Sequence, residues 1–113
     1  MTLGFVETRL FMSVRDDYFG EDASYSALQQ ALLKNPAAGA VISGSGGLRK
    51  IRWPDPRRGK GKRGGLRVIY LFLPETRRIV FLDVYDKDDA EDLTSEERKG
   101  LAATAQAIRL QFK

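Results

Sequence analysis

The chain has 113 residues, of which 42% are hydrophobic and 30% are charged, so its length and composition are those of one globular domain. It contains no cysteine and no histidine, which excludes disulfides and thiolate chemistry and removes the commonest general base and metal ligand. The net charge is +4, no apolar run is long enough to span a membrane, and the start lacks a signal-peptide pattern, so we expect a cytoplasmic protein.

The first 20 residues predict a short strand followed by a helix. Residues 3–7 are β-like and suit an edge strand, and Thr8 is placed to cap a helix that reaches about Phe19. Gly20 then ends this helix. Its apolar face is marked by residues at helical spacing, namely Phe11, Val14 and Tyr18.

A second helix follows almost directly. It begins at Asp22 or Ser24 and ends before Pro36, because proline disfavours helical geometry in the residue that precedes it. Its buried side is marked by Tyr25, Leu28 and Leu32. Residues 37–47 are small and rich in glycine, and we expect them to form a connection rather than an element.

Three strands are predicted in the middle of the chain, over residues 48–53, 66–73 and 78–85. Their short or hairpin-like joins imply an antiparallel meander. In the first strand, the period of two directs Ile51 and Trp53 to the core, and Lys50 and Arg52 to the opposite, displayed side.

A final helix is expected after an acidic turn. Thr94 and Glu97 match a capping box at its start. Its buried stripe would consist of Leu101, Ala105, Ile108 and Phe112. The acidic turn contains Asp86, Asp88, Asp89, Glu91 and Asp92. These carboxylates would suit a divalent metal or the positive end of the helix macrodipole, and we favour the second because Lys87 lies among them.

Positive charge is concentrated between the first two strands of the meander. Nine of the 19 Lys and Arg residues lie between residues 49 and 67, where Asp55 is the only anion, so the rest of the chain is net acidic. The nine cations are Arg49, Lys50, Arg52, Arg57, Arg58, Lys60, Lys62, Arg63 and Arg67. The stretch could be only a solvated hairpin tip. We favour polyanion binding, because the cations continue into the strands and the glycines let backbone approach a ligand.

The same loop carries Gly59, Gly61 and Gly64 in the G-x-G-x-x-G spacing of dinucleotide-binding proteins. That fingerprint requires a strand before it and a helix after it, whose N-terminus holds the pyrophosphate. A strand follows the glycines here, so we reject a nucleotide cofactor.

If the polyanion is RNA, the basic stretch has residue types that could cleave it. Attack by a 2′-oxygen requires a proton acceptor, stabilisation of the extra negative charge on the phosphate, and a proton donor for the leaving 5′-oxygen. Arginine suits the second role because it stays charged. Without histidine, the other two roles fall to a carboxylate, a tyrosine, or a lysine whose pKa is lowered by the like charges around it.

Five short motifs carry a family resemblance: GLRKIR at residues 47–52, GKGKRGG at 59–65, RVIY at 67–70, YDK at 85–87 and EDL at 91–93. Together they strongly resemble the RelE/HigB family of toxins from bacterial type II toxin–antitoxin systems, and the HigB-like branch most. The resemblance implies a single α+β domain over residues 1–113: an antiparallel meander with two N-terminal helices packed on it and a C-terminal helix nearby. It also implies a ribosome-dependent endoribonuclease that cleaves mRNA in the ribosomal A site without a metal or other cofactor.

Carried over residue by residue, the resemblance implies a catalytic site that contains Lys50, Arg52, Arg67 and Lys87. Arg67 would stabilise the scissile phosphate, and a lysine would act as base or hold ribosomal RNA. Many RelE-like members have arginine at the position of Asp88, so the general acid and base stay open, with Tyr85 and Tyr70 as candidates ranked below Arg67. RNA and ribosome contacts would come from Arg49, Arg57, Arg58, Lys60, Lys62 and Arg63.

The resemblance implies a protein partner as well. This would be an antitoxin of the HigA type, a helix-turn-helix protein that neutralises the toxin and represses their shared operon. The residues alone leave two alternatives: a catalytically inert RNA- or DNA-binding module with the same basic surface, and a domain whose basic surface binds only an acidic protein.

Overall fold

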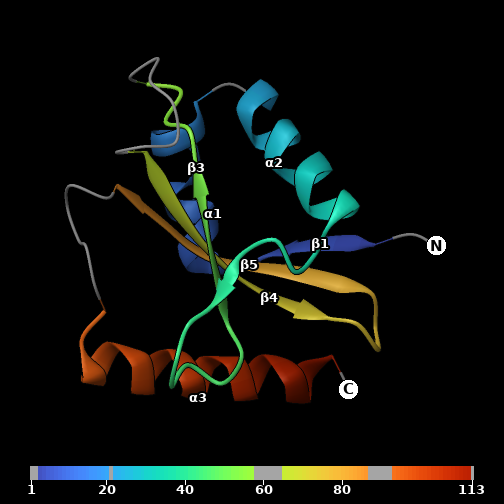
Figure 1. Ribbon diagram of the computed structural model, residues 1–113, viewed down its shortest axis with the longest axis vertical. Helices are drawn as coiled ribbons and strands as arrows, with labels where there is room; N and C mark the ends of the chain where they lie inside the picture. Colours follow the sequence, from blue (N-terminus) through green and yellow to red (C-terminus); the bar gives the residue numbers. More distant parts are fainter. Residues whose placement is uncertain (1–2, 21, 58–64, 87–92, 113) are drawn as a thin grey trace.

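The computed structural model describes residues 3–20, 22–57, 65–86 and 93–112. In chain order, these ranges form β1 (Gly4–Glu7), α1 (Arg9–Phe19), α2 (Asp22–Lys34), β2 (Ala40–Val41), β3 (Arg49–Trp53), β4 (Leu66–Leu73), β5 (Arg78–Asp86) and α3 (Ser95–Gln111). Figure 1 shows the helices arranged around a twisted sheet. Within the described ranges, no helix is long and apolar enough to cross a membrane.

The five strands lie in the order β1-β5-β4-β3-β2. The predicted meander is confirmed, because β3 pairs antiparallel with β4, and β4 pairs antiparallel with β5. Two details differ from the prediction. β1 is an edge strand but runs parallel to β5, so the sheet is mixed. β2 belongs to the segment that we expected to be only a connection, and its two residues pair with β3.

The helix ends follow the local signals in the sequence. The Thr8 side chain accepts a hydrogen bond from the backbone N–H of Phe11, and Gly20 ends α1 with a φ of 58°, a conformation that glycine adopts without strain. At α3, the Glu97 N–H donates to the Thr94 hydroxyl, and the Glu97 carboxylate accepts from the Thr94 N–H. The predicted capping box is therefore present.

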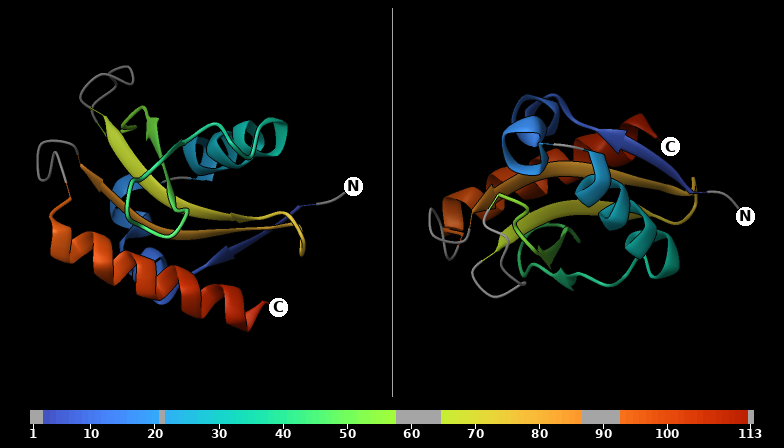
Figure 2. Two further views of the ribbon diagram at one scale, coloured as in Figure 1. Left: turned by 60° about the horizontal axis from the view of Figure 1, so that its bottom comes forward. Right: turned by 90° about the horizontal axis from the view of Figure 1, so that it is seen from above.

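The sheet separates two apolar clusters. On one face, Phe11 and Phe19 of α1 and Leu28 of α2 pack with Val68 of β4 and Phe81 of β5. On the other face, Ala105 and Ile108 of α3 pack with the alternate residues of the same strands. Figure 2 shows α2 and α3 on opposite sides of the sheet. The faces are called the α2 side and the α3 side below.

Candidate nucleic-acid interface

Three predicted site residues form a row across the three central strands. Arg52 of β3 lies opposite Arg67 of β4, and Arg67 lies opposite Tyr85 of β5. Directly opposed residues in a sheet share a face and have Cβ atoms about 4.5–5.5 Å apart. Lys50 lies on the same face, two residues before Arg52, where it pairs with Ile69. Ile69 belongs to the cluster beneath α3, so the row lies on the α3 side.

The charges in this row do not stabilise the sheet. Two like charges directly opposite each other on neighbouring strands are destabilising, and Arg52 and Arg67 are such a pair. Arg67 is only 8% exposed, whereas Arg52 is exposed and Lys50 is half-buried. Stability alone would not favour two arginines directly opposite each other on neighbouring strands, so the row is suited to an anion that both could bind.

Arg67 lacks a counter-charge within the described ranges. Its guanidinium donates one hydrogen bond, from Nη1 to the carbonyl oxygen of Leu66 at 3.2 Å. None of the ion pairs among the described residues includes it. A buried guanidinium without a carboxylate has lost hydration without gaining an ionic partner, and a phosphate would supply one.

Tyr85 faces this row because of a bulge in β5. The pairing of β4 with β5 slips between Ile69, which lies opposite Asp83, and Tyr70, which lies opposite Phe81. Leu82 is the extra residue and packs on the α3 side. Asp83, which follows it, lies opposite Ile69 and lines a groove with Leu101 and Thr104 of α3, so it is on the same side. Without the slip, strict alternation from Phe81 would turn Tyr85 to the α2 side, away from Arg67.

Arg49 lies on the opposite face from the row. It pairs with Tyr70, which belongs to the α2-side cluster. Its Nη1 donates to the carbonyl oxygens of Ala37 at 3.3 Å and Gly39 at 2.8 Å. These bonds hold the segment before β2 against the sheet. We predicted Arg49 as an RNA contact, and its register places it on the face opposite the basic row.

Arg57, the other predicted RNA contact in the described ranges, is engaged by carboxylates. Its guanidinium lies 2.8 Å from Asp55 and 3.0 Å from Asp86, both of which are buried. Asp86 is the last residue of β5 and binds Arg57. We had counted it in the acidic turn before the final helix, and it belongs instead to the strand. The predicted contacts outside the described residues are Arg58, Lys60, Lys62, Arg63 and Lys87.

Asp83 is a site residue that the sequence did not reveal. The bulge places this half-buried carboxylate on the α3 side, two residues before Tyr85 in β5 and opposite Ile69. Burial raises its pKa, and the hydrogen bond from the Val84 N–H at 2.8 Å partly opposes that rise. A carboxyl group next to the basic row is a candidate for proton transfer. Strict alternation from Phe81 would place Asp83 on the other face, and the sequence gives no sign of the bulge.

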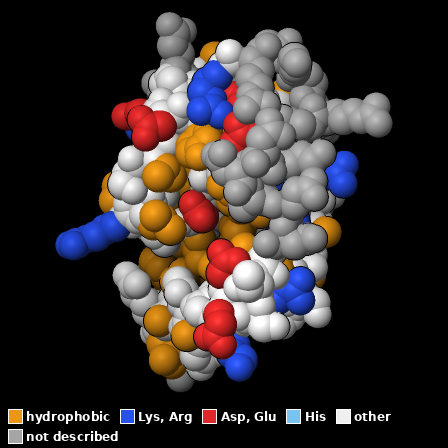
Figure 3. Space-filling model, turned by 90° about the vertical axis from the view of Figure 1, so that its left-hand side faces the viewer, with side chains coloured by type: hydrophobic (Ala, Val, Ile, Leu, Met, Phe, Trp, Pro, Cys, Tyr) orange, Lys and Arg blue, Asp and Glu red, His pale blue; other side chains and the backbone are white. Residues whose placement is uncertain are grey.

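A groove beside Asp83 separates α1 from α3. It has a volume of about 220 Å³ and is lined by Thr8, Leu10, Leu82, Asp83, Leu101 and Thr104. Figure 3 faces the side of the molecule where β5 ends and α3 begins, and it shows hydrophobic side chains around a hollow with acidic side chains among them. The lining of this groove is mostly apolar with one carboxylate, whereas the basic row carries arginine and lysine side chains. The fold therefore presents an apolar groove as well as the basic row.

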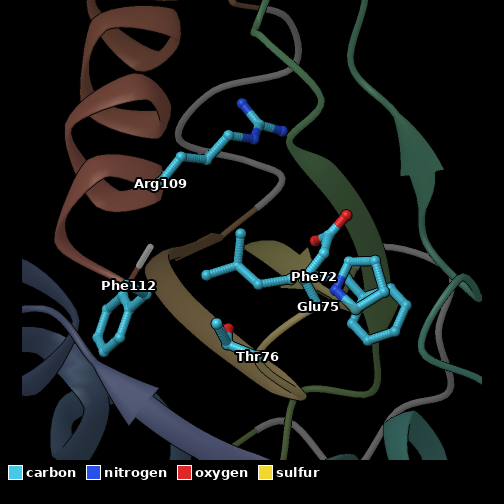
Figure 4. Close-up of a pocket in the computed structure, with 7 residues that line it drawn as sticks. Phe72, Glu75, Thr76, Arg109 and Phe112 are labelled. Carbon is cyan, nitrogen blue, oxygen red and sulfur yellow. The ribbon is translucent and has the colours of Figure 1, made fainter.

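A larger pocket of about 470 Å³ lies at the far end of the sheet. It is formed by the turn between β4 and β5 and the last turn of α3, as Figure 4 shows. Arg109, Glu75 and Phe72 line it. Arg67 and Tyr85 lie at the other ends of β4 and β5, so this pocket is not part of the candidate site. Among the described residues, no group of three or more potential ligands could hold a metal ion.

The comparisons with known proteins establish the fold. No family model matches the chain. Among solved structures, the chain is similar to a double arginine-to-alanine mutant of E. coli toxin RelE in the free state, with 16% sequence identity and a TM-score of 0.57, over 92% of this chain and 97% of that chain. The predicted RelE-like α+β fold is confirmed, and identity at this level carries no residue roles with it.

Proposed function

We propose that the protein is the toxin of a type II toxin–antitoxin system, of the HigB-like branch, and that it cleaves mRNA in the ribosomal A site. The observation that carries the proposal is the row of Arg52, Arg67 and Tyr85, in which the buried guanidinium of Arg67 has no carboxylate partner among the described residues. The RelE-like fold supports the class of protein, and the motifs at residues 47–52 and 59–65 support the branch.

The proposed chemistry follows from the positions in this row. The 2′-oxygen of a ribose attacks the adjacent phosphorus, the bond from phosphorus to the 5′-oxygen breaks, and the products are a 2′,3′-cyclic phosphate and a free 5′-hydroxyl. Arg67 and Arg52 bind the non-bridging oxygens, where negative charge increases in the transition state. The proton leaves the 2′-hydroxyl and another reaches the 5′-oxygen through Lys50, Lys87 or Tyr85, with no metal or other cofactor required.

The proposed partners follow from the same class. A helix-turn-helix antitoxin of the HigA type would neutralise the enzyme in the cytoplasm, and the substrate would be mRNA on a translating 70S ribosome. The cations at Arg58, Lys60, Lys62 and Arg63 would contact RNA phosphates, each contributing a salt-dependent share of the affinity.

The test is to induce the protein in cells and map the 5′ ends of messages. We expect wild type to arrest translation and to produce new 5′ ends within reading frames, and Arg67→Ala to produce neither. Arg77→Gly is the matched control, because it also removes one arginine, at an exposed position at the far end of β4 and β5. Its φ of 53° is one that glycine adopts without strain.

Two results would contradict the proposal. New 5′ ends that persist in Arg67→Ala together with Lys50→Ala would remove the site assignment. Wild type that binds RNA but produces no new 5′ ends while ribosomes are translating would instead indicate an inert nucleic-acid-binding module. Binding of that kind would weaken with salt in proportion to the number of phosphates contacted.

A further inference from the structure

Arg57 connects three segments of the fold that are distant in sequence. Its Nε donates to Asp55 at 3.0 Å, and its Nη2 donates to Asp55 at 2.8 Å and to Asp86 at 3.0 Å. Its guanidinium carbon lies 4.7 Å from the centre of the Tyr18 ring. The two carboxylates are 1% and 5% exposed in their side chains. The contacts thus join the residues after β3 to the end of β5 and to the end of α1.

This cluster lies directly behind the basic row. Asp86 follows Tyr85 in β5 and pairs with Leu66, which precedes Arg67 in β4. Because neighbours along a strand point to opposite faces, the cluster is on the α2 side and the row is on the α3 side, one residue apart on both strands. Any change that loosens the cluster therefore acts on the ends of the two strands that hold Arg67 and Tyr85.

The contacts of Arg57 do not suit an RNA phosphate. One guanidinium faces two buried carboxylates within 3.0 Å, and its hydrogen bonds with Asp55 raise the pKa of Arg57 above its ordinary value. An approaching phosphate would compete with those two carboxylates for the same N–H donors. Most of the guanidinium's donors also point at partners that it would have to release.

We infer that Arg57, Asp55 and Asp86 form a positioning clamp, which fixes the ends of β4 and β5 so that Arg67 and Tyr85 hold a productive spacing in the proposed cleavage. The inference rests on the proposed function for its catalytic consequence. In this inference Arg57 acts on cleavage only by positioning Arg67 and Tyr85. It does not itself contact RNA. A misplacement of about 1 Å in a reacting group can cost a factor of about 100 in rate.

The decisive comparison uses two substitutions that change the charge in opposite directions. Arg57→Ala removes a positive charge, and Asp86→Asn removes a negative one. If Arg57 contacted RNA, the first would weaken RNA affinity and the second would strengthen it. A clamp predicts that both lower the single-turnover cleavage rate on programmed ribosomes by about tenfold or more. The slope of log affinity against log salt for a single-stranded RNA oligonucleotide would stay unchanged in both.

A matched control exists one helical turn earlier in α1. Arg15 lies 3.0 Å from Glu7 and 5.2 Å from the centre of the Tyr25 ring, so it repeats the arginine, carboxylate and tyrosine arrangement away from the row. Arg15→Ala and Glu7→Gln should lower thermal stability as the clamp variants do, yet leave the cleavage rate within twofold of wild type. A tenfold loss in these variants would attribute the effect to general stability and overturn the clamp.

The remaining outcomes also decide the matter. The slope of log affinity against log salt would fall by about 0.7 in Arg57→Ala if one phosphate contact on a single strand were lost, and that result would overturn the clamp. Cleavage within twofold of wild type in both clamp variants would overturn it as well. If wild type itself does not cleave, the proposed function fails, and amide hydrogen exchange without RNA still tests the clamp. Exchange at residues 66 and 67 should be at least tenfold faster in both variants, and unchanged exchange would overturn the inference.

Discussion

Replacing Arg67 by methionine should stabilise the protein while abolishing its proposed activity. The guanidinium is 8% exposed, donates one hydrogen bond at 3.2 Å to a backbone carbonyl, and has no carboxylate partner in the described ranges. Methionine keeps the aliphatic stem in place and removes the buried charge and its repulsion from Arg52. The two effects would have opposite signs because, in the proposed function, Arg67 serves contact with the RNA phosphate and not the stability of the free protein.

The magnitude follows from the burial. Burying an incompletely paired polar or charged group costs about 1–3 kcal/mol in protein mutational data, and the lost bond to Leu66 returns part of that. We expect the free energy of unfolding to rise by about 1 kcal/mol, which corresponds to about 4 °C in Tm for a domain of this size. Removing one preorganised donor to the developing charge should lower the cleavage rate by a factor of about 100 to 1,000.

Arg49→Met provides the matched control. It is the same substitution in the same sheet, but this guanidinium donates to two carbonyl oxygens on the opposite face. Those carbonyls would lose their partner, so Arg49→Met should lower the free energy of unfolding by about 1–3 kcal/mol. RNA affinity should be unaffected.

Urea denaturation followed by tryptophan fluorescence measures both variants. The chain has one tryptophan, Trp53, which packs against the α2-side cluster and donates its indole N–H to Ser24 at 3.3 Å. Its emission should therefore report the loss of that packing. A drop of more than 1 kcal/mol in Arg67→Met would refute the reasoning, since it would show that Arg67 is satisfied within the free protein. Equal effects in the two variants would refute it as well.

Three further outcomes are expected. Gly39→Ala should lower Tm, because a Cβ there would lie 2.9 Å from Cε1 of the Tyr70 ring, and overpacking of this kind costs about 1–3 kcal/mol; an unchanged Tm would show that the ring can move. The pKa of Asp83 is raised in the folded state, so the fold binds this proton more tightly and its stability falls as pH rises through the interval between the unfolded and folded pKa. Asp83→Asn should be more stable than wild type at pH 7 and no more stable near pH 3, and a gain that is independent of pH would contradict the burial argument. Thr94→Ala should cost about 1 kcal/mol through loss of the capping box, while Thr104→Ala, whose hydroxyl donates within the exposed side of α3, should cost less than half of that in the same thermal melts.

Local signals in the sequence predicted most of the architecture correctly. The capping hydrogen bonds of Thr8, Gly20 and Thr94 join residues no more than four positions apart, so these helix ends can be predicted from local sequence. The alternation in β3 likewise predicted that Ile51 and Trp53 pack inward, with Arg52 displayed. Such interactions can be predicted from neighbouring residues because both partners are separated by a fixed, short length of chain.

The sequence did not predict which face of the sheet each site residue occupies. The slip between β4 and β5 at Leu82 places Asp83 and Tyr85 on the α3 side. The pattern of residues within β5 does not predict this slip. Which arginines remain available to an anion was equally hidden: Arg57 meets Asp86, 29 residues away, and Arg49 meets carbonyls that precede β2.

The sequence alone thus determined the positions of the three helices and of every strand except β2, which residues are apolar enough for the core, and where positive charge is concentrated. Only the tertiary structure decided which cations are matched internally and which face a common surface. The reason is physical: hydrogen bonds and ion pairs form between whichever groups the packed sheet brings within about 3 Å. In this chain those partners are set by strand register, which depends on long-range pairing and not on the order of neighbouring residues.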